Sequence, residues 1–279
     1  MQNDQSIKDM VKDRYTEIAT QSKSTNASSC CGAGGCSTVD LQIMSEDYTS
    51  LDGYLADADL GLGCGIPTQF AQIKAGDTVV DLGSGAGNDA FVARSIVGED
   101  GRVIGIDMTQ VMVDLARNNA QKLNLSNVEF RLGDIENMPL TANKADVVIS
   151  NCVLNLVPNK EKAFQEMYRV IKTGGHFSVS DIVIVGQLPT ELLQEAEMYA
   201  GCIAGAIQKD TYLDIIHKAG FSDVRIMKEK AIDLPDDILS NYLSADQIAS
   251  WRNSGTGIYS ITVFGVKAKT CGCGDNCCS

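Results

Sequence analysis

Ten cysteines stand out in this chain of 279 residues, because thiols bind soft ions and take part in redox chemistry. They fall in two glycine-rich clusters, CCGAGGC and CGCGDNCCS, and at three single positions. A lone cysteine is usually a small buried hydrophobe, but thiols among glycines have little around them that could bury them. The clusters therefore indicate metal, metalloid or redox sites. They comprise Cys30, Cys31 and Cys36 near the N-terminus, and Cys271, Cys273, Cys277 and Cys278 at the other end.

The three single cysteines lie in separate segments that can converge. Cys64 sits in the turn GLGCGIP, Cys152 directly follows an expected strand, and Cys202 lies in a stretch expected to cover the end of that strand. Structural zinc needs four ligands and favours C-x-x-C spacing, which these positions lack. Trivalent arsenic on three thiolates keeps a lone pair, which can act as a nucleophile without a base. The only two histidines, His176 and His217, occupy positions typical of structural residues.

A glycine-rich turn, DLGSGAG, runs from Asp81 to Gly87 between an apolar strand and a helix. Glycines allow the backbone to approach a ligand, and the helix N-terminus supplies free N–H donors. The spacing is G-x-G-x-G, whereas dinucleotide sites carry G-x-G-x-x-G. Asp107 follows the next strand, twenty residues after Gly87, where its carboxylate can accept ribose hydroxyls. A nucleotide-like cofactor is expected at this edge.

Two further acids, Asp134 and Glu136, follow the third expected strand. The carboxyl ends of parallel strands meet at one edge of an open sheet, which is where such folds bind ligands. Structural alternatives remain for two of these acids: Asp107 as a helix cap and Asp134 as a turn residue.

The elements that position these residues alternate regularly between strand and helix. Apolar runs at 78–83, 102–107, 128–134, 145–150 and 176–183 alternate with amphipathic stretches at 89–97, 110–124 and 160–172. This alternation predicts an α/β fold with a parallel sheet covered on both faces. The expected organisation is an N-terminal helix and cysteine-bearing loops (1–66), a core (67–184), a helical insertion with Cys202 (185–209), completion of the sheet (210–269) and a cysteine-rich tail (270–279).

DLGSGAG, GIDMT, GDIENMPL, SNCVLNLVP and KTGG together resemble the class I S-adenosylmethionine (SAM) methyltransferases. The resemblance implies a Rossmann-like sheet of seven strands, mostly parallel with an antiparallel last strand. It also implies a SAM site whose product is S-adenosylhomocysteine (SAH). Gly83, Gly85 and Gly87 would flank the methionine part, Asp107 would bind ribose, Ile135 and Glu136 would lie near adenine, and Asn151 near the amino-acid end. Asp81, Ser84 and Met108 are assigned to the same site.

GLGCGIP, SNCVLNLVP and AGCIAGA narrow the resemblance to the arsenite methyltransferases. It implies that Cys64, Cys152 and Cys202 bind As(III), supplied as arsenite or methylarsenite, under a cover formed by the helical insertion. In this family one further N-terminal cysteine pairs with the equivalent of Cys64. The sequence leaves open whether Cys30, Cys31 or Cys36 takes that part. A thioredoxin or glutathione-type reductant would reset the thiols, and no catalytic metal ion is expected.

Two other functions stay open on the sequence. A carbon or oxygen methyltransferase of the quinone or sterol type would share the cofactor half without needing the three cysteines. A metalloid-sequestering protein could retain an inactive methyltransferase fold, although an inactive site would not require the glycine spacing of DLGSGAG.

Composition limits the partners and the location. The net charge of −13 argues against nucleic acid and anionic membranes, which attract basic surfaces. No apolar run reaches the roughly 18 residues of a membrane span, and the first residues are too polar for a signal peptide. We expect a cytoplasmic arsenic-detoxifying enzyme, and nothing demands more than a monomer.

Overall fold

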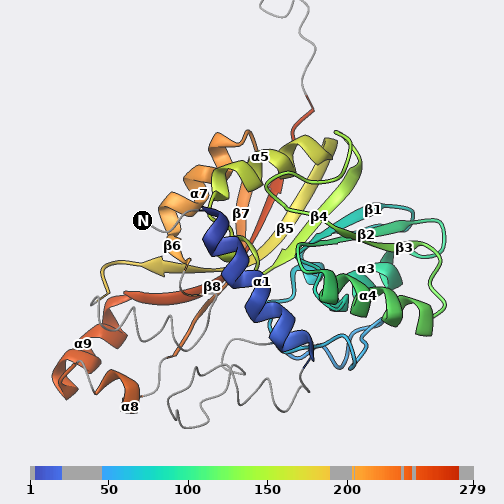
Figure 1. Cartoon of the computed structure of the whole chain (residues 1–279). Helices are drawn as coiled ribbons and strands as arrows, with labels where there is room; N and C mark the ends of the chain where they lie inside the picture. Colours follow the sequence, from blue (N-terminus) through green and yellow to red (C-terminus); the bar gives the residue numbers. More distant parts are fainter. Residues whose placement is uncertain are drawn as a thin grey trace, which may run out of the picture.

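The computed structural model describes residues 4–20, 46–188, 203, 205–233, 236–240 and 243–269. Its centre is a sheet with helices on both faces (Figure 1). The strands are β1 (Thr78–Leu82), β2 (Arg102–Asp107), β3 (Val128–Leu132), β4 (Ala145–Asn151), β5 (Ile171–Val185), β6 (Ile207–Gln208), β7 (Ser222–Ala231) and β8 (Gly257–Val266). The helices are α1 (Asp4–Thr20), α3 (Asn88–Val97), α4 (Gln110–Lys122), α5 (Lys160–Val170), α7 (Lys209–Lys218), α8 (Asp236–Leu239) and α9 (Ala245–Ser254), with short 3-10 helices η2 (Pro67–Gln69) and η3 (Leu154–Leu156).

The strands lie in the order β3-β2-β1-β4-β5-β8-β7, and β6 pairs with β5. Every pairing is parallel except those of β8, which runs antiparallel to both β5 and β7. The predicted mostly parallel sheet with an antiparallel last strand is therefore confirmed. The described residues form eight strands rather than the expected seven. The additional strand is β6, whose two residues pair with Val183 and Ile184.

Strand β6 lies within the range 185–209 that the sequence predicts as a helical insertion. Its backbone groups pair with the end of β5, so this part of the segment is strand and not helix. Residues 189–202 and 204 lie outside the described part of the chain, and the rest of that expectation stays a prediction.

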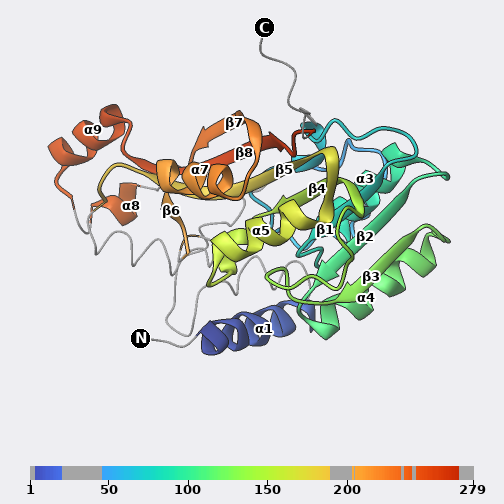
Figure 2. The same cartoon turned by 90° about the horizontal axis from the view of Figure 1, so that it is seen from above.

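The two faces of the sheet are buried by different helices, as the views in Figures 1 and 2 show. Adjacent strand residues point to opposite faces. Val80 and Ile104 belong to one core cluster with residues of α5 and α7, whereas Val79 and Val103 belong to another with residues of α3 and α4. Burial on both faces explains why the central strands read as continuous apolar runs.

Strand β5 begins five residues earlier than the expected run at 176–183. The sequence predicts Lys172–Gly175 as a helix stop before the strand, but α5 ends at Val170 and β5 starts at Ile171. The reason is backbone pairing: the Gly174 N–H donates to the Lys267 carbonyl, and the Lys267 N–H donates to Gly175. These bonds extend the strand through the two glycines.

The predicted N-terminal helix is confirmed as α1, shown in blue in front of the sheet in Figure 1. The sequence predicts an apolar face with Met10 and Ile18 on this helix; Ile18 is buried, but Met10 is 53% exposed. Helices α8 and α9 lie at the opposite end of the molecule from α3 and α4 (Figures 1 and 2). Among the described residues, no helix is both long and apolar enough to cross a membrane.

Candidate active site

A pocket of about 130 Å³ opens at the carboxyl ends of β1, β2, β3 and β4, the edge where α/β sheets bind ligands. Most of the residues that the sequence assigns to the cofactor line it. These are Asp81, Gly83, Ser84, Gly85, Asp107, Met108, Ile135 and Asn151. Gly87 and Glu136 do not line the pocket.

The glycine turn uses the backbone freedom that its sequence supplies. Gly83, Gly85 and Gly87 have φ angles of +63°, +50° and +100°, a region that disfavours other residues. A Cβ at Gly83 would lie 2.3 Å from the Val153 side chain, so this position has no room for one. A Cβ at Gly85 would meet nothing within 4 Å and would project into the open space. Because the turn has no side chains at its glycines, its backbone lines the pocket directly.

Asp107 ties the glycine turn to the end of β2. Its carboxylate accepts hydrogen bonds from the Gly85 N–H at 3.0 Å and from the Thr109 N–H at 2.8 Å. Thr109, not Asp107, occupies the N-cap position of α4, and its side chain makes no capping hydrogen bond there. Burial raises the pKa of Asp107, while the hydrogen bonds from Thr109 and Gly85 counteract the rise.

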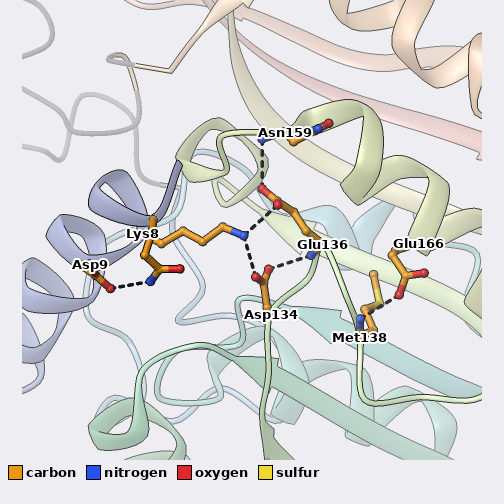
Figure 3. A network of polar contacts seen from close by, with 8 residues as sticks. Lys8, Asp9, Asp134, Glu136, Met138, Asn159 and Glu166 are labelled. Carbon is orange, nitrogen blue, oxygen red and sulfur yellow. Dashed lines mark hydrogen bonds and ion pairs between the residues drawn. The ribbon is translucent and has the colours of Figure 1, made fainter. Parts of the chain in front are cut away.

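Asp134 and Glu136 are joined by a lysine that the sequence did not single out (Figure 3). Lys8 Nζ of α1 lies 2.7 Å from Asp134 Oδ2 and 2.8 Å from Glu136 Oε2. The other Asp134 oxygen accepts the Glu136 N–H, so Asp134 is also the turn residue that one alternative proposed. Burial opposes ionisation of Asp134, but the Lys8 ammonium, the Glu136 N–H and the charge of Lys162 together lower the pKa of that carboxyl.

Cys152 lines the same pocket, one residue beyond the end of β4. It has a φ of +60°, which is uncommon for a residue with a side chain. Its N–H donates to the Ser180 carbonyl at 2.7 Å, which holds this conformation. Strain of this kind persists only where the surroundings enforce it, and it is often found at functional sites.

Cys64 is held by a turn pressed onto the sheet. Its N–H donates to Asn151 Oδ1 at 3.0 Å, and its carbonyl accepts from Ser260 Oγ at 2.6 Å. A Cβ at Gly63 would lie 2.6 Å from Asn151, and one at Gly65 would lie 2.5 Å from Ser180 Oγ. The glycines on both sides of Cys64 therefore let the turn approach β4 and β5 this closely.

Cys64 and Cys152 are both buried and belong to one core cluster with Ile203. Cys202, the residue before Ile203, lies outside the described residues, as do Cys30, Cys31, Cys36 and the cysteines of the tail. In the part of the chain that the structure describes, no three His, Cys, Asp or Glu side chains form a metal-binding group. The structure brings together two members of the predicted cysteine triad.

The sequence and fold were compared with those of known proteins. The profile of a methyltransferase domain family matches residues 73–220. An arsenite methyltransferase of Halobacterium salinarum is 41% identical over 78% of this chain and 58% of its own length. Another from Aquipseudomonas alcaligenes is 30% identical over 84% of this chain and 67% of its own.

A solved structure agrees with these relatives. It is that of CrArsM, an arsenic(III) SAM methyltransferase from Chlamydomonas reinhardtii, with a TM-score of 0.63 and 35% identity over 74% of this chain and 68% of that one. The chain belongs to the arsenite methyltransferase family. It spans little more than half the length of the Halobacterium salinarum relative.

This member of the arsenite methyltransferase family has a polar network under the Cys64 turn that its sequence did not reveal. Asn151 Nδ2 donates to Tyr48 Oη at 2.8 Å and to Asp89 Oδ2 at 3.1 Å, and Tyr48 Oη also lies 2.9 Å from Asp89 Oδ1. Burial raises the pKa of Asp89 to about 6, although the hydrogen bonds from Asn151 and Tyr48 lower it. The network fixes the Asn151 amide, and thereby the Cys64 N–H.

Another buried acid lies within β5. Asp181 is fully buried and accepts a hydrogen bond from Tyr212 Oη at 3.0 Å. Burial raises the pKa of Asp181 to about 7, partly offset by the Lys160 ammonium. Burial also raises the pKa of Tyr212 well above its ordinary value, and Asp181, Cys64 and Cys152 add to the rise. These partners come from distant segments, so no local motif could have identified them.

Proposed function

We propose that this chain transfers a methyl group from SAM to trivalent arsenic bound by Cys64, Cys152 and Cys202. One observation carries the proposal. Cys152 lines the pocket beside Asn151, and the same residue lies in the buried cluster that contains Cys64. The expected methyl donor and the expected acceptor would thus meet at the end of one strand. The family relationship supports the same assignment.

The pocket suits a polar, nucleotide-like cofactor. Ser84 Oγ and Asn88 Oδ1 both line it, are buried and have no hydrogen-bond partner among the described residues. Buried polar atoms without partners are rare in folded proteins, and a bound ligand with matching groups would satisfy them. The open space above Gly85 would accommodate part of the cofactor. The carboxylate oxygens of Asp107 could accept hydrogen bonds from the ribose hydroxyls.

Bound SAM would supply a methyl group on a sulfonium, whose carbon accepts an electron pair as the carbon–sulfur bond breaks. The protein contributes by positioning the arsenic relative to the methyl group. Cys64, Cys152 and Cys202, as thiolates, would hold arsenic so that its lone pair points at the methyl carbon, about 3 Å away. The pair forms the new arsenic–carbon bond, and the old bonding pair stays on the sulfur of SAH. No proton is removed from arsenic, so the site needs no base.

Methylation formally oxidises arsenic to the pentavalent state, and two electrons must return it to the trivalent state. We assign this work to Cys64 with one of Cys30, Cys31 and Cys36, whose two thiols would close to a disulfide. An external dithiol of the thioredoxin type, or glutathione, would then reduce the disulfide. The substrate would be arsenite or methylarsenite.

The test is methyl transfer from labelled SAM to arsenite with excess thiol, comparing the wild type with Cys152→Ser and Cys202→Ser. Each variant should lose at least about a hundredfold in rate, since serine is a poor ligand for a soft ion. Calorimetry should show SAH affinity unchanged within about threefold, because Ser and Cys have similar size. Cys271→Ser, the same substitution in the tail, serves as the control and should retain activity.

A triple Cys30, Cys31 and Cys36 to Ala variant should complete about one turnover per enzyme and then stop. Multiple turnover by this variant would disprove the redox assignment alone. If the wild type binds SAH but makes no methylated arsenic, the arsenic assignment is wrong and an organic acceptor or sequestration takes its place.

A further inference from the structure

Helix α1 forms one wall of the pocket and carries the only basic side chain among the described residues that line it. Lys8, Val11 and Tyr15 all line the pocket. Their spacing of three and four residues places them on one face of a helix. This face presents apolar side chains and one ammonium to the ligand space.

The two acids that bind Lys8 are also held by backbone hydrogen bonds that do not involve Lys8 (Figure 3). In Asp134, Oδ1 accepts the Glu136 N–H at 2.9 Å, which leaves Oδ2 for Lys8. In Glu136, Oε1 accepts the Asn159 N–H at 3.0 Å, which leaves Oε2 for Lys8. Each carboxylate therefore uses one oxygen to accept a backbone N–H and the other to bind α1.

The Lys8–Glu136 pair is shielded from water, whereas the side chain of Asp134, the other partner of Lys8, is 39% exposed. The side chains of Lys8 and Glu136 are 16% and 5% exposed. Losing one partner of a shielded pair is costly, because the other charge is left without compensation. The hydrogen bonds and charges of Asp134 and Glu136 also raise the pKa of Lys8 despite its partial burial, so the ammonium persists.

Apolar packing alone holds α1 weakly. Ile18 is its only fully buried residue, although α1 also packs against α4. Most of the stability of a helix in a protein comes from tertiary packing, so tertiary contacts must maintain α1. The Lys8 contact therefore adds a polar anchor to the packing that keeps α1 over the pocket.

We propose that Lys8 is a positioning residue that closes α1 over the cofactor pocket, so that the Lys8–Asp134–Glu136 contact sets how long the adenosyl cofactor stays bound. This proposal rests on the proposed function for the identity of the cofactor. The contact does not involve the methyl group, so SAM and SAH should be retained alike.

The experiment compares Lys8→Met with Lys12→Met, which removes the same charge one turn later on α1, from a side chain that does not line the pocket. Release of labelled SAM and of labelled SAH is followed after rapid dilution. Lys8→Met should raise both dissociation rates about tenfold, whereas Lys12→Met should change them less than about twofold. Lys8→Arg, which keeps the charge, should restore most of the retention.

A second measurement separates this proposal from the proposed function. Hydrogen exchange of α1 amides in the protein without ligand should be roughly tenfold faster in Lys8→Met than in Lys12→Met. A general loss of the fold would instead speed exchange in β1 and β4 as well. Equal effects of the two variants on α1 exchange and on release would overturn the closing role of Lys8. A wild type that does not bind SAM would disprove the proposed function, and α1 exchange would still decide whether Lys8 closes the helix.

Discussion

Burial of the single carboxyl group of Asp181 makes the stability of the fold depend on pH. It has no exposed surface. Its carboxyl accepts hydrogen bonds from Tyr212 Oη and from the backbone N–H groups of Ile182 and Asn155, and the charge of Lys160 acts on it as well. Burial disfavours the charged form and raises the pKa of the folded state to about 7, from an ordinary value of 3.8. Above pH 4 the folded chain therefore holds a proton that the unfolded chain releases. By linkage, this group lowers the stability as the pH rises toward 7.

Asp181→Asn should remove this dependence, because the amide resembles the protonated acid and cannot ionise. Relative to the wild type, the free energy of unfolding of Asp181→Asn should increase between pH 4 and pH 8 by up to about 4 kcal/mol. Chemical denaturation across this range measures the difference. The control is Asp223→Asn, the same change at an exposed side chain, which should show a much smaller trend. A constant difference for Asp181→Asn would mean that Asp181 ionises normally in the fold.

At this scale, the residues that could be predicted are those with a local signature. The glycine turn, Asp107 and Cys152 follow strand ends, and position along the chain places them at one edge. Lys8, Tyr48 and Asp181 could not be predicted, because their partners lie far away in the sequence. Asp134 was expected to take part in the site, but nothing in its own segment indicated that a lysine of α1 binds it.

Gly205, three residues after Cys202 in the sequence, lies against η3. A Cβ at Gly205 would lie 1.8 Å from the Asn155 carbonyl oxygen, so this backbone lies directly on η3. Ile203 is buried in the cluster that contains Cys64 and Cys152.

Gly205→Ala should push this segment away from η3 and weaken arsenic binding more than cofactor binding. Affinity for arsenite should fall roughly tenfold, with a stability loss of about 1–3 kcal/mol from overpacking. SAH affinity should change little, because the glycine turn is untouched. Titration with each ligand, in parallel with Gly257→Ala, tests this. At Gly257 a Cβ would make only ordinary contacts of 3.6 Å. Equal losses for both ligands in Gly205→Ala would indicate a general disturbance.

The elements themselves were predicted to different extents. The strands β1 to β4 and the helices between them follow from periodicity, since apolar runs and amphipathic stretches differ in length and spacing. The start of β5 and the strand β6 were missed, because both depend on pairing with distant backbone: Lys267 in one case and the end of β5 in the other. Two residues of strand carry no periodic signal.

The whole molecule carries a net charge of −13, and the pocket shares this character. Glu46, Asp59, Asp107 and Asp134 line it, and Lys8 is the only basic residue among the described residues that do. A negative field of this kind favours cationic ligands and is screened by salt. SAM carries a positive sulfonium that SAH lacks, so the two ligands should respond differently to ionic strength.

Raising the salt from 0.1 M to 1 M shortens the screening length from about 10 Å to about 3 Å. The dissociation constant of SAM should then increase several-fold, and that of SAH by less than about twofold, because only SAM loses attraction at the sulfonium. Calorimetric titration at both salt concentrations measures this. An analogue with an ammonium group in place of the sulfonium should behave like SAM, which separates charge from the methyl group. If the dissociation constants of all three ligands changed equally with salt, the acids would act only through direct hydrogen bonds. The negative field of the molecule would then have no effect at the reacting sulfur.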